Sequence, residues 1–282
     1  MRPADTARLV ALAAIWGASY LFNRIAAPAV GPVLTAELRT LIGRVALAAY
    51  FGFTGFDPQW RRFWRQYLLV AIFSSALPFV LWAYAALTTT AGLLSVLNAT
   101  SPMWGALCSA VVLRERLRAR QILGLVIGLA GVAVVTQPDS NTALHYPAIA
   151  AALAAAFSYG LIATYIKGWA KDVPSRGMAV GSQLAAGVVL VPFIPLWPPA
   201  SPPTPPVLFS VLALGLVCGA IAYLLYFRLI TDIGATGALT VTYLIPVFGV
   251  LWGALFLGET VSAWMLAGAA LVIVGTVFVL RN

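Results

Sequence analysis

The same set of residues occurs twice in this chain, at a constant offset of 144 positions. Pro102, Gly105, Glu115, Ala119, Gly124 and Gly131 are repeated as Pro246, Gly249, Glu259, Ala263, Gly268 and Gly275. Each copy lies in a long apolar run, and the two copies align without a gap. A repeat of this kind is typical of membrane carriers built from two related halves.

The composition indicates that most of the exterior faces lipid. Hydrophobic residues make up 62% of the chain and charged residues 9%, and the mean hydropathy is +0.95. A charged surface on all sides is therefore impossible, and we predict an all-α integral membrane protein. Cys108 and Cys218 lie in apolar runs without partners at metal-ligand spacing, so we expect no disulfide, no metal and no cofactor.

A helix crosses a bilayer with about 20 mainly apolar residues. Dividing the chain at charges, prolines and polar clusters predicts ten transmembrane helices, at 8–28, 34–56, 67–88, 91–112, 119–136, 147–167, 177–197, 207–229, 235–257 and 262–280. Residues 1–140 then form a first five-helix repeat, and residues 141–282 form a second.

Basic residues predict the orientation, because Lys and Arg gather in short cytoplasmic loops. With a cytoplasmic N-terminus, fourteen of the seventeen basic residues fall on the cytoplasmic side and none falls in 137–146 or 198–206. Both termini are then cytoplasmic. Topology accounts for the net charge of +9, so a nucleic-acid partner is not needed.

Five helices per half is an odd number, so the second half enters the membrane in the opposite direction. The repeat is therefore predicted to be inverted. The segment 114–118 carries three arginines and its counterpart 258–261 carries none, as opposite sides of the membrane require. An even number of spans, with a missed break in 177–206, is the competing interpretation.

These features resemble the EamA type of the drug/metabolite transporter superfamily. The resemblance rests on Trp16-Gly17-Ala18-Ser19, on Glu37-Leu38-Arg39, and on two prolines each followed thirteen residues later by Glu. It implies a ten-helix exporter of amino acids, other metabolites or drugs. Asn98 ahead of Pro102 and Tyr243 ahead of Pro246 are similar to the bacterial aromatic amino acid exporters, although Ser101 stands where some of those carry a bulky aromatic residue.

The repeated prolines predict a binding site. A proline inside a membrane helix frees the carbonyl one turn earlier, here those of Asn98 and Thr242, and in inverted-repeat carriers substrate binds near the midplane between the halves. The alternative is that neighbouring hydroxyls satisfy these carbonyls. Helical spacing extends the candidate substrate-binding face to Trp16, Tyr20, Asn23, Pro78, Trp82, Asn98, Ser101, Phe157, Ser158, Tyr223, Thr242 and Tyr243.

Aromatic faces with a few polar groups suit an aromatic amino acid or a delocalised cation. For each of these aromatic residues, a lipid-facing or packing role is the alternative. Trp60, Trp64 and Tyr67 are expected at the membrane interface. The glycines Gly17, Gly124, Gly128, Gly131, Gly268 and Gly275 are expected to allow close helix packing.

The ionisable residues bear on energy coupling. No carboxylate is placed near the midplane, where it would act as a proton relay, and Arg44 is the only charge well inside a span. For Glu37 we predict an ion pair with an arginine that stabilises the bundle. Transport is then expected to follow the substrate gradient or exchange, without tight proton coupling.

Two other classes of protein are disfavoured. An enzyme would need a nucleophile with its base or a set of metal ligands, and His145 has no such cluster around it. A channel is more often built from identical subunits. We therefore expect a multi-pass exporter of the bacterial cytoplasmic membrane, for which a monomer would suffice. Its partners are a small-molecule substrate, most of all an aromatic amino acid, and the lipid bilayer. An exporter of cationic drugs or other small metabolites is the second candidate.

Overall fold

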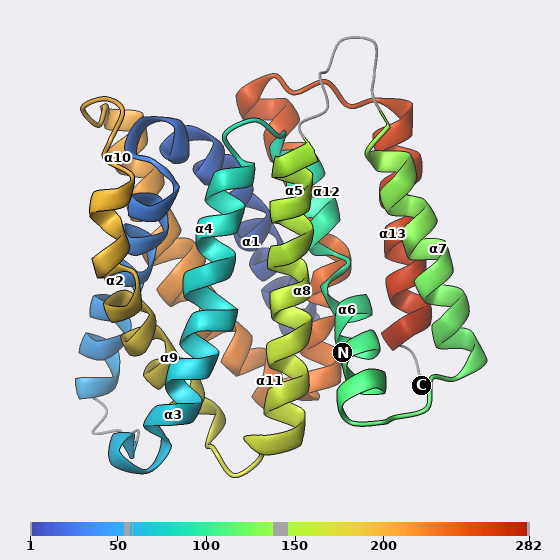
Figure 1. Cartoon of the computed structure of the whole chain (residues 1–282), viewed down its shortest axis with the longest axis horizontal. Coiled ribbons are helices and arrows are strands. Elements are labelled where there is room, and N and C mark those ends of the chain that lie inside the picture. The colour runs from blue at the N-terminus through green and yellow to red at the C-terminus, as the bar shows by residue number, and fades with distance from the viewer. Residues whose placement is uncertain (1, 54–56, 58, 138–145, 281–282) are drawn as a thin grey trace.

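The structure is a computed structural model that describes residues 2–53, 57, 59–137 and 146–280. Within these ranges all regular elements are helical. Figure 1 shows the helices running side by side along one common direction, so that their ends gather at two opposite ends of the bundle. The predicted all-α fold class is confirmed for the part of the chain that is described.

The first half of the chain contains α1 (Pro3–Val30), α2 (Pro32–Phe53), α3 (Trp60–Ala71), the π-helical stretch Ile72–Ala76, α4 (Leu77–Ala85), α5 (Ala91–Asn98), α6 (Ser101–Val112) and α7 (Ala119–Val135). The second half contains α8 (Tyr146–Trp169), α9 (Ser175–Val189), the 3-10 turn Val191–Leu196, α10 (Pro205–Leu212), the π-helical stretch Ala213–Ile221, α11 (Ala222–Leu239), α12 (Val241–Leu257) and α13 (Ala263–Leu280).

Several of these helices are long enough to cross a membrane. Among the described residues, six stretches are both long and apolar enough, namely Pro3–Val30, Trp60–Ala85, Tyr146–Trp169, Pro205–Gly234, Gly237–Leu257 and Ala263–Leu280. Ala119–Val135 and Gly181–Leu196 are shorter apolar helices. The chain is therefore a multi-pass membrane protein, whereas the count of ten spans and the side on which the termini lie stay predictions.

The predicted span 91–112 is interrupted between α5 and α6. The carbonyls of Leu97 and Asn98 accept hydrogen bonds from the hydroxyls of Thr100 and Ser101, at 2.6 and 2.7 Å. That of Ala99 accepts one from Thr276 of α13, at 2.8 Å. The expectation of an unpaired Asn98 carbonyl is thus wrong, because the alternative applies and hydroxyls satisfy it.

The second copy is interrupted at a different place. Pro246 lies inside α12, while the helix break comes earlier, at Thr240 between α11 and α12. Within α11, Gly234 also departs from helical geometry, with φ 77° and ψ 164°. A positive φ costs glycine little, so the chain can change direction at this position. The repeat in the sequence therefore does not place the two helix breaks at matching positions.

Glycines allow the helices to approach one another closely, as the sequence predicts. The longest helix contact joins α7 to α13. A Cβ atom added to Gly131 would lie 2.7 Å from the backbone nitrogen of Val272, and one added to Gly17 would lie 2.9 Å from that of Gly249. In lipid such packing replaces the hydrophobic effect in holding helices together.

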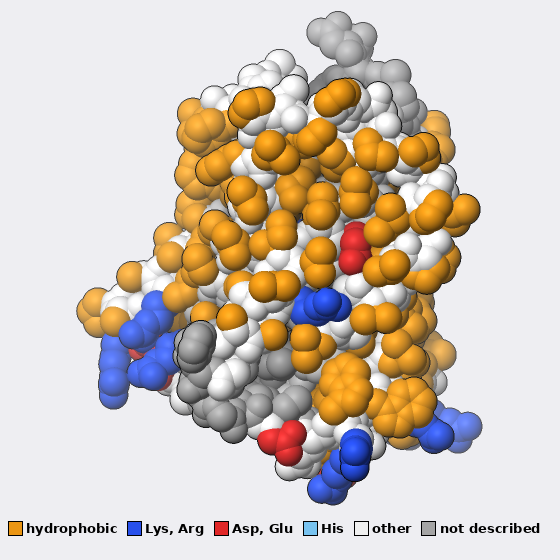
Figure 2. Space-filling view, turned by 90° about the vertical axis from the view of Figure 1, so that its left-hand side faces the viewer, with side chains coloured by type: hydrophobic (Ala, Val, Ile, Leu, Met, Phe, Trp, Pro, Cys, Tyr) orange, Lys and Arg blue, Asp and Glu red, His pale blue; other side chains and the backbone are white. Residues whose placement is uncertain are grey.

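The exterior matches the composition. Figure 2 shows one face on which hydrophobic side chains cover most of the height of the molecule, while most of the Lys and Arg side chains in view lie towards its lower end. Exposed apolar side chains such as Val45, Val111, Leu129 and Phe209 are expected where the solvent is lipid. This arrangement is compatible with the predicted topology, in which basic residues mark the cytoplasmic side.

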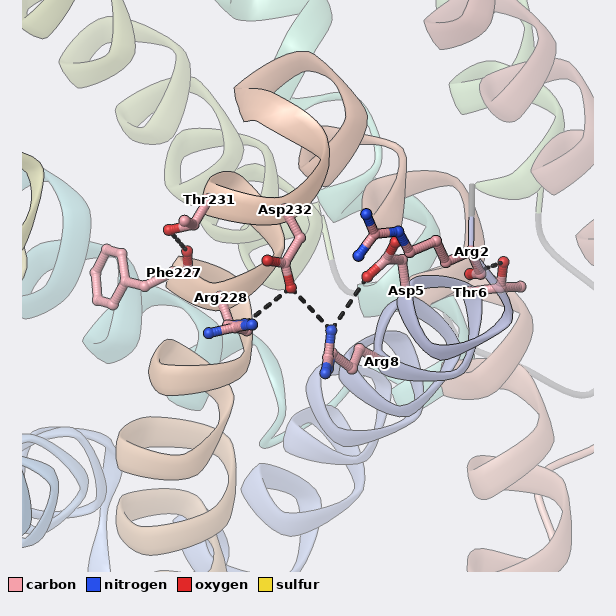
Figure 3. A network of polar contacts seen from close by, with 8 residues as sticks. All are labelled: Arg2, Asp5, Thr6, Arg8, Phe227, Arg228, Thr231 and Asp232. Atoms are coloured by element: carbon pink, nitrogen blue, oxygen red, sulfur yellow. Dashed lines mark hydrogen bonds and ion pairs between the residues drawn. The ribbon is translucent and has the colours of Figure 1, made fainter.

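A network of charged groups joins the two halves near the start of α1. Arg8 donates hydrogen bonds to Asp5 at 3.1 Å and to Asp232 of α11 at 2.8 Å, and Arg228 donates to Asp232 at 2.9 Å (Figure 3). Asp5 is buried. Because Arg8 contacts carboxylates from both halves, this network links α1 to α11 at the end of the bundle where basic residues gather.

Candidate functional site

A cavity of about 600 Å³ lies between the two halves. The first half contributes side chains from α1, α2, the π-helical stretch Ile72–Ala76, α4, α5, α6, α7 and the connection between α6 and α7 to its wall. The second half contributes side chains from α8, α11, α12 and α13. A volume of this size is within the usual range for small-molecule sites, which is about 300–1,000 Å³. The cavity is therefore the candidate substrate site.

Two thirds of the side chains predicted from the sequence line this cavity. These are Trp16, Tyr20, Asn23, Trp82, Asn98, Ser101, Tyr223 and Thr242. They come from distant parts of the chain, and the structure brings them together around one space. Their contact with substrate stays a prediction.

Four predicted residues are not part of the cavity wall. Pro78 is buried in the bundle, and Ser158 donates a hydrogen bond to the carbonyl of Phe73 at 2.7 Å. Phe157 is exposed and packs edge-on against Trp104, with ring centroids 5.6 Å apart. Tyr243 is half-buried. Periodicity found the correct helices but not the face towards the cavity, because Pro78 and Ser158 pack inside the bundle and Phe157 lies on its exterior.

Aromatic rings in contact with one another form much of the wall. Trp16 packs against Tyr226 at a centroid distance of 5.3 Å and against Tyr223 at 6.5 Å. Tyr20 packs edge-on against Trp82 at 5.4 Å. The amide of Gln183 donates to the Tyr223 hydroxyl at 3.1 Å and so fixes that ring. These rings offer apolar faces that can stack against an aromatic or large aliphatic group.

Arg39, Phe79 and Tyr159 also line the cavity, although they were absent from the predicted set. Arg39 lies on α2, and its guanidinium carbon is 3.9 Å from the centroid of the Phe79 ring. The signal for Arg39 was present in the sequence, since only three basic residues, Arg24, Arg39 and Arg44, fall outside the loops and termini. Tyr159 lies beside the predicted Phe157 and Ser158, on another face of the same helix.

The cavity opens at one end of the bundle. Its wall continues from the aromatic rings to Glu115, Arg116 and Leu117, in the connection between α6 and α7, and to Lys167 near the end of α8. Figure 1 shows this connection at the end of the bundle where α1 begins and α13 ends. Lys167 and Glu115 form an ion pair at 2.6 Å, with both side chains half-exposed. By the predicted topology this is the cytoplasmic end.

At the opposite end of the bundle, Arg24 and Glu259 form contacts between the two halves. Glu259 accepts hydrogen bonds from the backbone N–H groups of Ala91 and Gly92, at 2.7 and 3.1 Å, and so caps the start of α5. Arg24 lies 3.8 Å from the same carboxylate and donates to the carbonyl of Ala86 at 2.7 Å. These contacts join the two halves at this end, one residue beyond Asn23 of the cavity wall, and neither Arg24 nor Glu259 is part of that wall.

The expected ion pair of Glu37 is absent. Among the described residues Glu37 forms no ion pair, and its buried carboxylate accepts a long hydrogen bond of 3.5 Å from Thr40. Arg39 and Arg44 lie on the same helix as Glu37, but neither forms an ion pair with it. The prediction of a Glu37–Arg pair is therefore wrong.

A bundle of membrane-spanning helices with a cavity between the two halves of the chain is the arrangement that transporters use. The chain belongs to the EamA-like transporter family, whose sequence profile matches residues 7–137 and again residues 146–281. The resemblance seen in the sequence is thereby confirmed.

Similar proteins cover nearly the whole chain. The uncharacterized transporter YvbV of Bacillus subtilis is 28% identical over 95% of this chain and 89% of its own length. A probable terminal-alkyne amino-acid exporter of Streptantibioticus cattleyicolor is 24% identical over 97% and 92%. A crystal structure of a protein with 21% identity superposes with a TM-score of 0.67, covering 99% of this chain and 96% of that one, which supports the fold.

Proposed function

We propose that this chain is a secondary carrier that exports small amphipathic metabolites, with aromatic amino acids as the first candidates. The observation that supports this most is the cavity of about 600 Å³ with aromatic walls contributed by both halves. An aromatic side chain can stack on these rings, while Asn98, Ser101 and Thr242 offer polar groups to its backbone. The amino-acid exporter among the similar proteins agrees with this substrate class.

In this proposal the carrier has ten spans arranged as two inverted five-helix repeats, 1–140 and 141–282, in the bacterial cytoplasmic membrane. Both termini are cytoplasmic, and the cavity described above is open to the cytoplasm. Transport then requires the contacts of Glu259 with α5 and Arg24 to break while the opposite end closes. Two conformations that expose one cavity in turn constitute alternating access.

The test is uptake of radiolabelled Phe, Tyr and Trp into proteoliposomes that contain the purified protein. We expect saturable flux, counterflow, and competition among the three amino acids, because they would share one cavity. Asn98→Ala and Thr242→Ala should each lower the flux several-fold without preventing folding. Absence of flux and competition with all three amino acids would refute aromatic amino acids as substrates.

Proton coupling is predicted to be weak. Among the residues of the cavity wall the one carboxylate is Glu115, which lies at the open end and pairs with Lys167. A proton relay needs an ionisable group that the substrate can displace near the midplane. Flux measured with and without an imposed pH gradient should therefore differ by less than about twofold, since no proton is carried along with the substrate. A several-fold acceleration by the pH gradient alone would contradict this.

An exporter of delocalised organic cations is the second candidate, because cation–π attraction to the same aromatic rings would favour such a substrate. The charge of Arg39 in the wall opposes it, since a like charge repels a cation strongly where the dielectric constant is low. Competition of amino-acid uptake by a quaternary ammonium dye distinguishes the two candidates. Strong competition would favour the exporter of cations, and no competition would favour the exporter of amino acids.

A further inference from the structure

Arg39 is a buried cation whose side chain faces the cavity. It is 9% exposed, and it belongs to the wall of the cavity together with Tyr20, Trp82 and Tyr223. Its guanidinium lies over the Phe79 ring at 3.9 Å, and its Nε has no hydrogen-bond partner. The charge therefore has an aromatic face on one side and an unused donor group.

No carboxylate of the described residues neutralises this charge. Among the described residues, the basic members of ion pairs are Arg8, Arg24, Lys167 and Arg228. Arg39 is not among them. Glu37, the acidic group nearest in sequence, is engaged with Thr40. Leaving a buried charge without a partner costs several kcal/mol. An anion that enters the cavity beside Arg39 is therefore stabilised by this charge.

The surroundings define which anion fits. Tyr20, Tyr159 and Tyr223 line the same cavity as Arg39. Rings on several sides favour a ligand with an apolar or aromatic body. The basic side chains Arg116 and Lys167 are part of the open end of the wall, so Arg39 is the one cation among the aromatic rings of the described wall. A single guanidinium matches the single charge of a carboxylate, which it can bind through two parallel N–H donors.

We propose that Arg39 binds the carboxylate of the substrate, and that the substrates are monocarboxylic acids, zwitterionic amino acids included, with an aromatic or large apolar side chain. The acid group contacts Arg39, and the apolar body lies among Trp16, Trp82 and Tyr223. This inference rests on the proposed function, since it places the substrate in the transport cavity. It also makes Arg39 the residue that separates acids from their neutral or cationic analogues.

Binding can be tested without transport, by the thermal stability of the purified protein with 3-phenylpropionate and with its amide, 3-phenylpropanamide. We expect the acid to raise the Tm and to bind about 10- to 100-fold more tightly than the amide, the range that one or two charge-assisted hydrogen bonds provide. Arg39→Gln should remove this preference, and Arg39→Lys should keep part of it. The comparison of acid with amide is made within each variant, so a general loss of stability does not imitate the effect.

Arg44→Gln is the matched control, because Arg44 lies on the same helix but outside the cavity wall. It should keep the preference for the acid. If Arg39→Gln prefers the acid as strongly as the wild type does, the proposal is wrong. If that variant does not fold, Arg39→Lys decides. A preference for the acid equal to that of the wild type would contradict a bidentate guanidinium contact, and so would an equal affinity for the acid.

The outcome also separates this inference from the proposed function. If the wild type transports Phe but shows no preference for acids over amides, the carrier proposal stands and the role of Arg39 falls. If the wild type binds 3-phenylpropionate through Arg39 but transports no aromatic amino acid, the carboxylate site stands and the proposed substrate falls.

Discussion

We expect Glu259→Gln to expose the cavity to the side of the membrane opposite to its open end, because the proposed transport cycle requires the contacts of Glu259 to break there. The carboxylate of Glu259 accepts two backbone N–H groups at the start of α5 and lies 3.8 Å from Arg24, and it is almost completely buried. A neutral amide keeps the shape of the side chain but loses the charge. Hydrogen bonds to a charged group contribute about 1.5–3 kcal/mol, so the open-outside conformation should become about 10- to 100-fold more populated.

The measurement uses a single cysteine as a reporter. Asn23→Cys is placed in a background with Cys108→Ala and Cys218→Ala, because Asn23 lines the cavity one residue from Arg24. In whole cells, a membrane-impermeant maleimide should label this cysteine slowly, and Glu259→Gln should accelerate the labelling in proportion to the shift in population. Arg24→Gln should act in the same direction, since Arg24 belongs to the same contact.

Glu115→Gln provides the control. Glu115 is the repeat counterpart of Glu259, but here it forms a half-exposed pair with Lys167. Such surface pairs contribute about 0–1 kcal/mol, and the pair closes nothing on the outer side. The rate at which the reporter cysteine is labelled from outside should therefore stay within about twofold of the rate in the reporter protein that keeps Glu115. Equal rates for all three variants would show that Glu259 does not keep this end closed.

The two repeat-related glutamates show what a repeat in a sequence can predict. The offset of 144 residues identified Glu115 and Glu259 as equivalent positions, and the structure places both in connections at helix ends. It could not predict that one caps a helix while the other pairs with a lysine. A carrier in one conformation is asymmetric, and equivalent residues then have different neighbours. In the proposed alternating-access cycle, the repeat in the sequence corresponds to the whole cycle, whereas the structure corresponds to one state of it.

The prolines illustrate a second limit. Pro102 and Pro246 were expected to disturb their helices alike, but one follows a helix break and the other lies inside α12. The difference arises from side chains that are not repeated. Thr276 reaches from α13 to the carbonyl of Ala99, and Ser101 bonds to that of Asn98. A break in a membrane helix persists where hydroxyls satisfy the freed carbonyls, and such partners from other helices are invisible to local spacing.

Arg39 illustrates the opposite case, in which the information was in the sequence. Counting basic residues by loop explained fourteen of them and left Arg24, Arg39 and Arg44. An ionisable residue inside a span is expensive and usually functional. Two of the three have such positions: Arg24 lies beside Glu259, and Arg39 lies in the cavity wall. The predicted pair of Glu37 with an arginine failed because, among the described residues, no arginine lies within ion-pair distance of its carboxylate.

The second large effect is expected at the contact between α7 and α13. Gly275→Ala should destabilise the protein strongly, because a Cβ atom there would lie 2.6 Å from both the carbonyl oxygen of Gly124 and the backbone nitrogen of Gly128. Backbone atoms cannot move aside without separating the helices. Overpacking of this kind costs about 1–3 kcal/mol, which corresponds to a fall in Tm of about 2–12 °C for a chain of this size.

Gly105→Ala is the matched substitution, since the nearest atom to its added Cβ would be 3.8 Å away, an ordinary contact distance. It should leave the Tm unchanged or raise it slightly, because alanine favours the helix by about 0.5–1 kcal/mol. Thermal unfolding of both variants in the same detergent measures the difference. The packing interpretation requires Gly275→Ala to unfold at the lower temperature. Equal Tm values would mean that the two helices can separate at no cost, and that the repeated glycines at 124, 131, 268 and 275 have a role other than close packing.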